Sequence, residues 1–159
     1  MKFYSTRDRE RKQACTLREA VMMGLAPDGG LFVPERIPQA DLSEAERRAG
    51  ESYGSLASYL AGLFFGEDLD PQALRRELES LYDFPVPLRR VGRGRYTLEL
   101  FHGPTCAFKD FGAGFMGRAV GLLGAAGERL VILTATSGDT GSAVAHGFYN
   151  VPGVEVVVL

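Results

Sequence analysis

The carboxyl-terminal part of the chain alternates strand-like and helix-like segments, and this alternation constrains the fold more than any other feature. Runs of leucine, β-branched and aromatic residues predict strands at residues 96–101, 130–135 and 154–159. Apolar segments rich in glycine and alanine predict helices at residues 110–126 and 142–149. Strand–helix–strand connections within one sheet are parallel and right-handed. We therefore predict an α/β fold with an open, parallel β-α-β-α-β sheet.

Two polar loops, residues 102–109 and 136–141, interrupt this alternation. Each follows a predicted strand, so in a parallel sheet both loops would leave the carboxyl ends of strands at the same edge. That edge is where open α/β sheets bind ligands. We therefore expect a ligand site between the two loops.

Lys109, at the end of the first loop, is one of only three lysines in the sequence, and the others are Lys2 and Lys12. It is flanked by Phe108 and Phe111. Aromatic neighbours that desolvate an amine favour its neutral form, and a neutral amine attacks a carbonyl to form a Schiff base. The pattern thus indicates covalent carbonyl chemistry. Taken alone, it equally fits a lysine at a helix start whose aliphatic stem covers apolar surface.

The second loop, T-S-G-D-T-G, combines hydroxyl groups with backbone N–H groups at the start of a helix. Such a helix start binds carboxylates and phosphates, and Gly138 lets the backbone approach a ligand closely. Ordinary N-capping by Ser137, Asp139 or Thr140 is the alternative explanation. An amine on one loop and an anion cradle on the other are the minimum for holding an aldehyde cofactor beside an amino-acid carboxylate.

The amino-terminal half is predicted to be mostly helical. Residues 16–19, T-L-R-E, form a capping-box pattern that starts a helix ending near Met23. Residues 31–34 are extended. An apolar stripe with helical spacing runs through residues 43–65, and Asp70-Pro71 begins a further helix.

Prolines mark the end of this helical half, and residues 84–94 form a predicted hinge. We place a domain boundary there, which gives a mostly helical amino-terminal domain at residues 1–88 and an α/β domain at residues 89–159. Four arginines cluster in the hinge, which predicts a solvated connection: Arg89, Arg90, Arg93 and Arg95.

Composition excludes several classes of function. With 45% apolar and 24% charged residues the chain is globular, and neither a bilayer-spanning run nor a secretory signal occurs, so we expect a cytoplasmic location. The net charge of −2 and the lack of interleaved basic and aromatic residues argue against nucleic acid as a partner. The two cysteines and two histidines predict neither a disulfide framework nor a metal site.

Three motifs resemble those of the threonine synthase family, and they follow one another in the same order as in that family. They are the front segments T-L-R-E-A-V and G-L-A-P-D-G-G-L-F-V-P, then H-G-P-T-C-A-F-K-D-F-G around Lys109, and T-A-T-S-G-D-T-G-S-A-V-A around the second loop. The resemblance implies a lyase of fold type II, like tryptophan synthase β, with pyridoxal 5'-phosphate as cofactor. It also implies the last step of threonine biosynthesis, in which O-phospho-L-homoserine and water give L-threonine and phosphate.

The resemblance also implies roles for individual residues. Lys109 matches the catalytic lysine that carries the cofactor, Phe108 would wall the cofactor, and Asp139 would lie near its 3′-oxygen, where relatives often have asparagine. Three residues of the second loop would cradle the substrate carboxylate: Ser137, Gly138 and Thr140.

Members of that family are longer, and their cofactor-phosphate loop and the partner of the pyridine nitrogen lie downstream of the matched region. We therefore expect a truncated, amino-terminal piece that is inactive alone. Its open sheet edge would favour self-association or a partner chain. Two alternatives stay open: a related phospholyase acting on another phosphorylated amino acid, and a non-catalytic product of a truncated or split gene that binds a partner chain completing its sheet.

Overall fold

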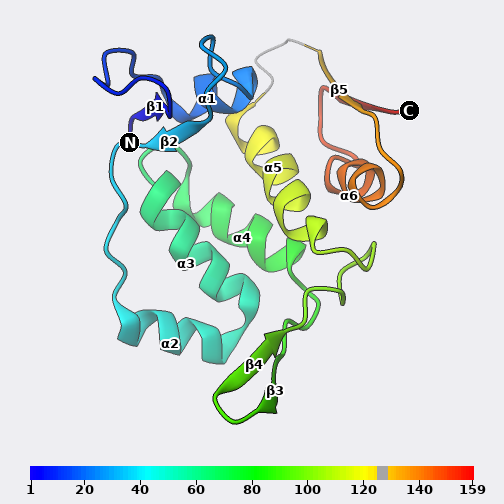
Figure 1. The fold of residues 1–159 in the computed structure, drawn as a ribbon. Coiled ribbons are helices and arrows are strands. Elements are labelled where there is room, and N and C mark those ends of the chain that lie inside the picture. Colours follow the sequence, from blue (N-terminus) through cyan, green and yellow to red (C-terminus); the bar gives the residue numbers. More distant parts are fainter. Residues whose placement is uncertain (125–128) are drawn as a thin grey trace.

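The computed structural model describes residues 1–124 and 129–159 of the chain. Figure 1 shows the elements, which follow one another in this order within the described residues: β1 (Phe3–Ser5), α1 (Leu17–Met23), β2 (Phe32–Pro34), α2 (Leu42–Glu51), α3 (Tyr53–Phe65), α4 (Pro71–Leu81), β3 (Leu88–Gly92), β4 (Arg95–Leu98), α5 (Lys109–Leu123), β5 (Leu130–Thr134), α6 (Asp139–Gly147) and β6 (Val154–Val158). None of the helices in these two ranges combines the length and the apolar character needed to cross a membrane.

The predicted helix starts at Thr16 and Asp70 are confirmed. The Thr16 hydroxyl accepts a hydrogen bond from the Glu19 N–H at 3.2 Å, and the Glu19 carboxylate accepts one from the Thr16 N–H at 2.7 Å. The Asp70 carboxylate likewise caps α4 by accepting from the Ala73 N–H at 2.7 Å. Both caps are local interactions that a few consecutive residues are sufficient to form.

The helical stripe predicted over residues 43–65 is divided into two helices. Ser52 has extended backbone angles, φ −168° and ψ 163°, and its hydroxyl caps α3 by accepting from the Ser55 N–H at 3.0 Å. The break allows α3 to lie very close to α4, since a Cβ built at Gly54 would be 2.8 Å from the Cα of Glu79. A continuous helix through Ser52 could not follow the separate axes of α2 and α3.

The prediction that the first strand belongs to the parallel sheet is wrong. The segment predicted as a strand at residues 96–101 supplies β4, which pairs antiparallel with β3, with Leu88 opposite Leu98. The arginine-rich segment predicted as a solvated connection spans this hairpin, and its arginines are exposed: Arg89 and Arg90 in β3, Arg93 in the turn and Arg95 in β4. Gly94, with φ 66°, makes the turn between the two strands. A strand pattern does not identify its partner, and a close neighbour in sequence pairs more readily than a distant one.

The second predicted unit is confirmed as a parallel β-α-β unit. β5 and β6 pair in parallel from Leu130 opposite Val154 to Thr134 opposite Val158, with α6 between them in sequence. One face of β5 is open, because Val131 is 52% exposed and Leu133 is 65% exposed. The predicted helix at residues 110–126 is α5, and residues 125–126 lie outside the described residues.

The main core lies between β1, α1, α3, α4 and α5. Leu74 and Leu78 of α4 are fully buried in it. Beside them the Tyr82 ring stacks on Phe111 at 5.7 Å, and the Tyr82 hydroxyl donates to the Phe111 carbonyl at 2.9 Å. Burial raises the pKa of the Tyr82 hydroxyl. These contacts attach the start of α5 to α4.

α5 lies between the α3–α4 pair and the α6–β5 unit (Figure 1). The approach of α5 to α6 depends on glycines. A Cβ at Gly117 would be 2.0 Å from the Gly147 carbonyl oxygen, and a Cβ at Gly147 would be 2.6 Å from the Ala113 carbonyl oxygen. Any side chain at these two positions would therefore force the helices apart. The predicted division into domains at residues 1–88 and 89–159 stays a prediction.

Candidate active site

Lys109 is the first residue of α5, one position earlier than predicted. The loop before it turns tightly, with a hydrogen bond from the Cys106 N–H to the Gly103 carbonyl at 3.0 Å and one from the Asp110 N–H to the Ala107 carbonyl at 3.1 Å. Cys106 has φ 57°, in the left-handed region that residues other than glycine rarely adopt. A tightly turned loop therefore delivers the lysine to the start of the helix.

The surroundings of Lys109 differ in part from the expected pair of flanking rings. Its Nζ atom lies 4.6 Å from the centroid of the exposed Phe108 ring, an arrangement in which the ring attracts a cation. Phe111 turns inward, with its ring 5.4 Å from Tyr53 and 5.7 Å from Tyr82. The half-buried lysine thus has the Phe108 ring beside its amine, whereas the Phe111 ring packs into the core against Tyr53 and Tyr82.

The second loop presents a helix start without a side-chain cap, so the N-capping alternative is not what the structure shows. Gly138 occupies the N-cap position of α6 with φ 155°, and no side chain accepts a capping hydrogen bond from the first turn of the helix. The Gly138 N–H itself donates to the Thr136 hydroxyl at 3.3 Å. Ser137, Gly138 and Asp139 are exposed, and Thr140 is half-buried. The first N–H groups of α6 are therefore directed toward an anion that approaches this end.

One cavity of about 650 Å³ brings the two loops together. Lys109 and Phe108 line it from the first loop and α5, and Thr140 lines it from α6. Its other walls are mainly apolar, and they come from α3, β4, α5 and α6: Tyr53, Leu98, Leu100, Phe111, Gly112, Ala113, Met116, Val144 and Phe148. Ser137, Gly138 and Asp139 are outside this lining, next to Thr140 in the chain. The cavity therefore joins an amine, an aromatic wall and a helix start.

The proximity of the loops is as predicted, but the predicted reason is wrong. β4 does not belong to the sheet of β5 and β6, so no common sheet edge connects the loops. They are neighbours because α5 and α6 pack closely at Gly117 and Gly147. Sequence reasoning also missed Tyr53 and Phe148, which reach the cavity from distant parts of the chain and carry no local motif.

Two polar groups close to the lysine loop are paired with each other. The His102 Nε2 atom lies 2.7 Å from the Glu99 carboxylate, whose other oxygen is 3.7 Å from Arg89 Nε. Neither residue lines the cavity, so the charge inside its described lining comes from Lys109.

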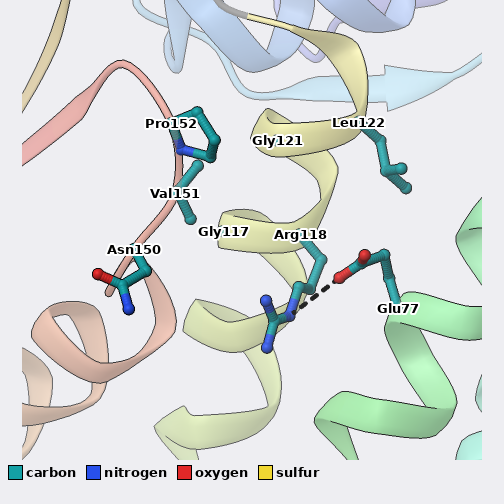
Figure 2. A pocket seen from close by; sticks show the side chains of 8 residues that line it. All are labelled: Glu77, Gly117, Arg118, Gly121, Leu122, Asn150, Val151 and Pro152. Atoms are coloured by element: carbon teal, nitrogen blue, oxygen red, sulfur yellow. Dashed lines mark ion pairs between the residues drawn. The ribbon is translucent and has the colours of Figure 1, made fainter.

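A second cavity, of about 280 Å³, lies where α5 meets α4 and the loop before β6 (Figure 2). In it Arg118 of α5 faces Glu77 of α4, with Nε 3.5 Å from the carboxylate. Asn150, Val151 and Pro152 close the opposite side. None of the predicted site residues lines this space, and its arginine and glutamate face each other, so the candidate site is the cavity at Lys109.

Comparison with known proteins gives a consistent result. The family model for the threonine synthase N terminus matches residues 2–82. The threonine synthase of Serratia marcescens is 41% identical over the whole chain, which covers 36% of that protein, and that of Escherichia coli is 39% identical with the same coverage. The chain thus spans about a third of the length of these relatives.

Solved structures of threonine synthases resemble this chain as well. The crystal structure of threonine synthase from Escherichia coli superposes with a TM-score of 0.85 and 37% identity, over 99% of this chain and 36% of the other. The structure of pyridoxal-phosphate-bound threonine synthase from Brucella melitensis superposes with a TM-score of 0.88 and 33% identity, over 99% of this chain and 35% of the other. The helical part and the β-α-β unit are therefore arranged as in these enzymes.

Proposed function

The chain belongs to the threonine synthase family, and from this premise we propose that it forms the lysine-bearing part of an enzyme that converts O-phospho-L-homoserine and water into L-threonine and phosphate. The observation that carries the proposal is the cavity shared by the Lys109 amine and the uncapped start of α6. An amine and an anion-binding helix end across one cavity are suited to an amino-acid substrate.

The described residues fit pyridoxal phosphate as the cofactor. The cavity of about 650 Å³ has mainly apolar walls, and the lysine amine lies beside an aromatic ring at its edge. When bound, the cofactor supplies an aldehyde that takes up the amine and a pyridine ring that withdraws electrons from the substrate. A relative of the chain from Brucella melitensis binds it.

Each residue of the site has a proposed task. Lys109 holds the cofactor through its amine and, once released by the substrate, carries protons to and from the substrate carbons as general acid and base. Phe108 would cover one face of the cofactor, and Asp139 would lie near its 3′-oxygen. The residues that hold the substrate carboxylate are at the start of α6, where N–H groups and hydroxyls converge: Ser137, Gly138 and Thr140.

We also propose that these 159 residues do not complete the reaction alone. Within the described lining of the cavity, Lys109 is the one cationic side chain, and its amine would be taken up by the aldehyde of the cofactor. A phosphate group is normally bound by several donors. The relatives are about three times as long as the matched region, and we assign the cofactor-phosphate contacts to their additional length.

Chemical trapping tests the proposed cofactor site. The purified chain is incubated with pyridoxal phosphate and reduced with borohydride, and the labelled peptides are mapped by mass spectrometry. We expect the label on Lys109 in preference to Lys2 and Lys12, which serve as internal controls on the same molecule. Lys109→Ala should lose the selective label and keep the background. Equal labelling of all three lysines would contradict the proposal.

We further propose that the chain self-associates through the β5–β6 sheet, which has open strand edges and one uncovered face within the described residues. Parallel strands are normally covered on both faces, whereas Val131 and Leu133 are exposed here. We expect sedimentation velocity to show self-association that increases with concentration and weakens in Leu133→Lys. Leu25→Lys, at an apolar residue that is 59% exposed outside the sheet, is the matched control. A monomer at high concentration would exclude self-association.

A further inference from the structure

Asp110, the residue that follows Lys109, is a buried carboxylate. It is only 5% exposed, which is unusual for a charged side chain. Both of its oxygens are bonded to one residue of the preceding loop: Oδ2 accepts from the Thr105 N–H at 3.0 Å, and Oδ1 accepts from the Thr105 hydroxyl at 2.6 Å. Hydrogen bonds to a charged group are among the stronger ones in proteins. The Thr105–Asp110 contact therefore closes the loop directly around Lys109.

The loop that this contact closes is under strain. Cys106 is held at φ 57°, and such a conformation persists only where the surrounding structure enforces it. Gly103 adds to the constraint, because a Cβ there would be 2.5 Å from Asp110 Oδ2. The carboxylate is thus the centre on which Gly103 and Thr105 are packed.

The helix α5 begins without a side-chain cap. Phe108 occupies the N-cap position, has helical backbone angles and makes no side-chain hydrogen bond to the helix. Asp110 lies in the first turn, where a negative charge interacts favourably with the helix dipole. The two hydrogen bonds that Thr105 donates to Asp110 therefore tie the first turn of α5, where the Lys109 side chain leaves the helix, to the preceding loop.

We propose that Asp110 is the positioning residue for Lys109, and that it acts through Thr105 to hold the amine at the edge of the cavity. The inference rests on the proposed function, since it assigns to a buried carboxylate the placement of the lysine that carries the cofactor. Asp110 itself does not line the cavity and does not touch the reacting atoms. Its contribution is the fixed geometry of the loop.

A matched pair of variants tests the positioning role. Thr105→Val keeps the shape of the side chain and removes the hydroxyl that donates to Asp110, whereas Thr105→Ser keeps the hydroxyl. The measurement is the ratio of label on Lys109 to label on Lys2 and Lys12, for pyridoxal phosphate with borohydride and, separately, for trace acetic anhydride. We expect the Lys109 ratio to change by about tenfold in Thr105→Val, as for the loss of one hydrogen bond to a charged group, and to be restored in Thr105→Ser. Asp110→Ala should change it at least as much.

Two controls separate positioning from stability and from the proposed function. Both reactions are run at low temperature on protein shown by circular dichroism to be folded, because a purely structural contact would lower the melting temperature and leave the ratio among folded molecules unchanged. That unchanged ratio in Thr105→Val would overturn the inference, even if Asp110→Ala fails to fold. If the wild-type chain shows no selective pyridoxal phosphate label, the proposed function fails, and the acetic anhydride ratios still decide the positioning role.

Discussion

Replacing Gly117 with alanine should destabilise the protein by about 3 kcal/mol, the upper part of the range for adding a methyl group to a fully packed contact. The added Cβ would lie 2.0 Å from the Gly147 carbonyl oxygen and 2.8 Å from its carbonyl carbon. Both atoms are backbone, so neither can move aside as a flexible side chain would. The strain is relieved only if α5 and α6 separate.

Gly121→Ala is the matched control for this prediction. It places the same methyl group on the same helix, but the nearest atom would be Val151 Cγ1 at 3.7 Å, an ordinary contact. Because alanine is the better helix former, this variant should be unchanged or more stable by about 0.5–1 kcal/mol. Urea denaturation of both variants against the wild type provides the measurement. Equal stabilities of the two variants would show that the α5–α6 contact is looser than the structure indicates.

The same substitution should also affect the site. Lys109 and Phe108 reach the cavity from the start of α5, and Thr140 reaches it from α6. A separation of the two helices would move the amine away from the helix start that is proposed to hold the carboxylate. In Gly117→Ala molecules that remain folded, we therefore expect weaker selective labelling of Lys109 by pyridoxal phosphate than in Gly121→Ala.

Local signals in the sequence were sufficient to predict several helix starts. Thr16 with Glu19, and Asp70 with Pro71, cap α1 and α4 as expected. Each of these signals is complete within four consecutive residues, and the atoms that bond are brought together by the helix itself. The helix α6 was also predicted from the sequence, but it begins at Asp139, three residues before the predicted start at residue 142.

Interactions between distant residues were not predictable in the same way. The division at Ser52 is explained by the close packing of Gly54 against Glu79, a contact that no pattern within residues 43–65 reveals. The strand at β4 was identified, but its partner is the neighbouring β3 rather than β5. Strand pairing is decided by turn geometry and by competition among strands, so an alternating pattern alone leaves it open.

The residue types of the candidate site could be predicted from the sequence, but the contacts that position them could not. Lys109 and the loop at residues 136–141 were recognisable from residue types, and the structure brings them to one cavity. The burial of Asp110 was missed, because acidic side chains are rarely buried unless they are paired. Its bonding partner, Thr105, lies only five positions earlier. That loop turn depends on Cys106 adopting a left-handed conformation, which residue type does not predict.

Replacing Leu78 with alanine should destabilise the protein by about 2–5 kcal/mol, because it leaves a cavity in the core. Leu78 is 0% exposed and packs where α4 supports α3 and α5, whereas Leu42, at the start of α2, is 76% exposed. Leu42→Ala makes the same chemical change at the surface and should alter the stability by less than about 0.5 kcal/mol. Thermal and urea denaturation of both variants provide the comparison.

The Leu78→Ala variant also separates global stability from the local geometry of the site. Leu78 belongs neither to the loop closed by Thr105 and Asp110 nor to the residues that line the cavity at Lys109. Molecules that stay folded at low temperature should therefore keep the wild-type ratio of label on Lys109 to label on Lys2 and Lys12, despite the large loss of stability. A ratio that falls with stability in Leu78→Ala would mean that the lysine is positioned by the whole core, and that the Asp110 contact has no separate role.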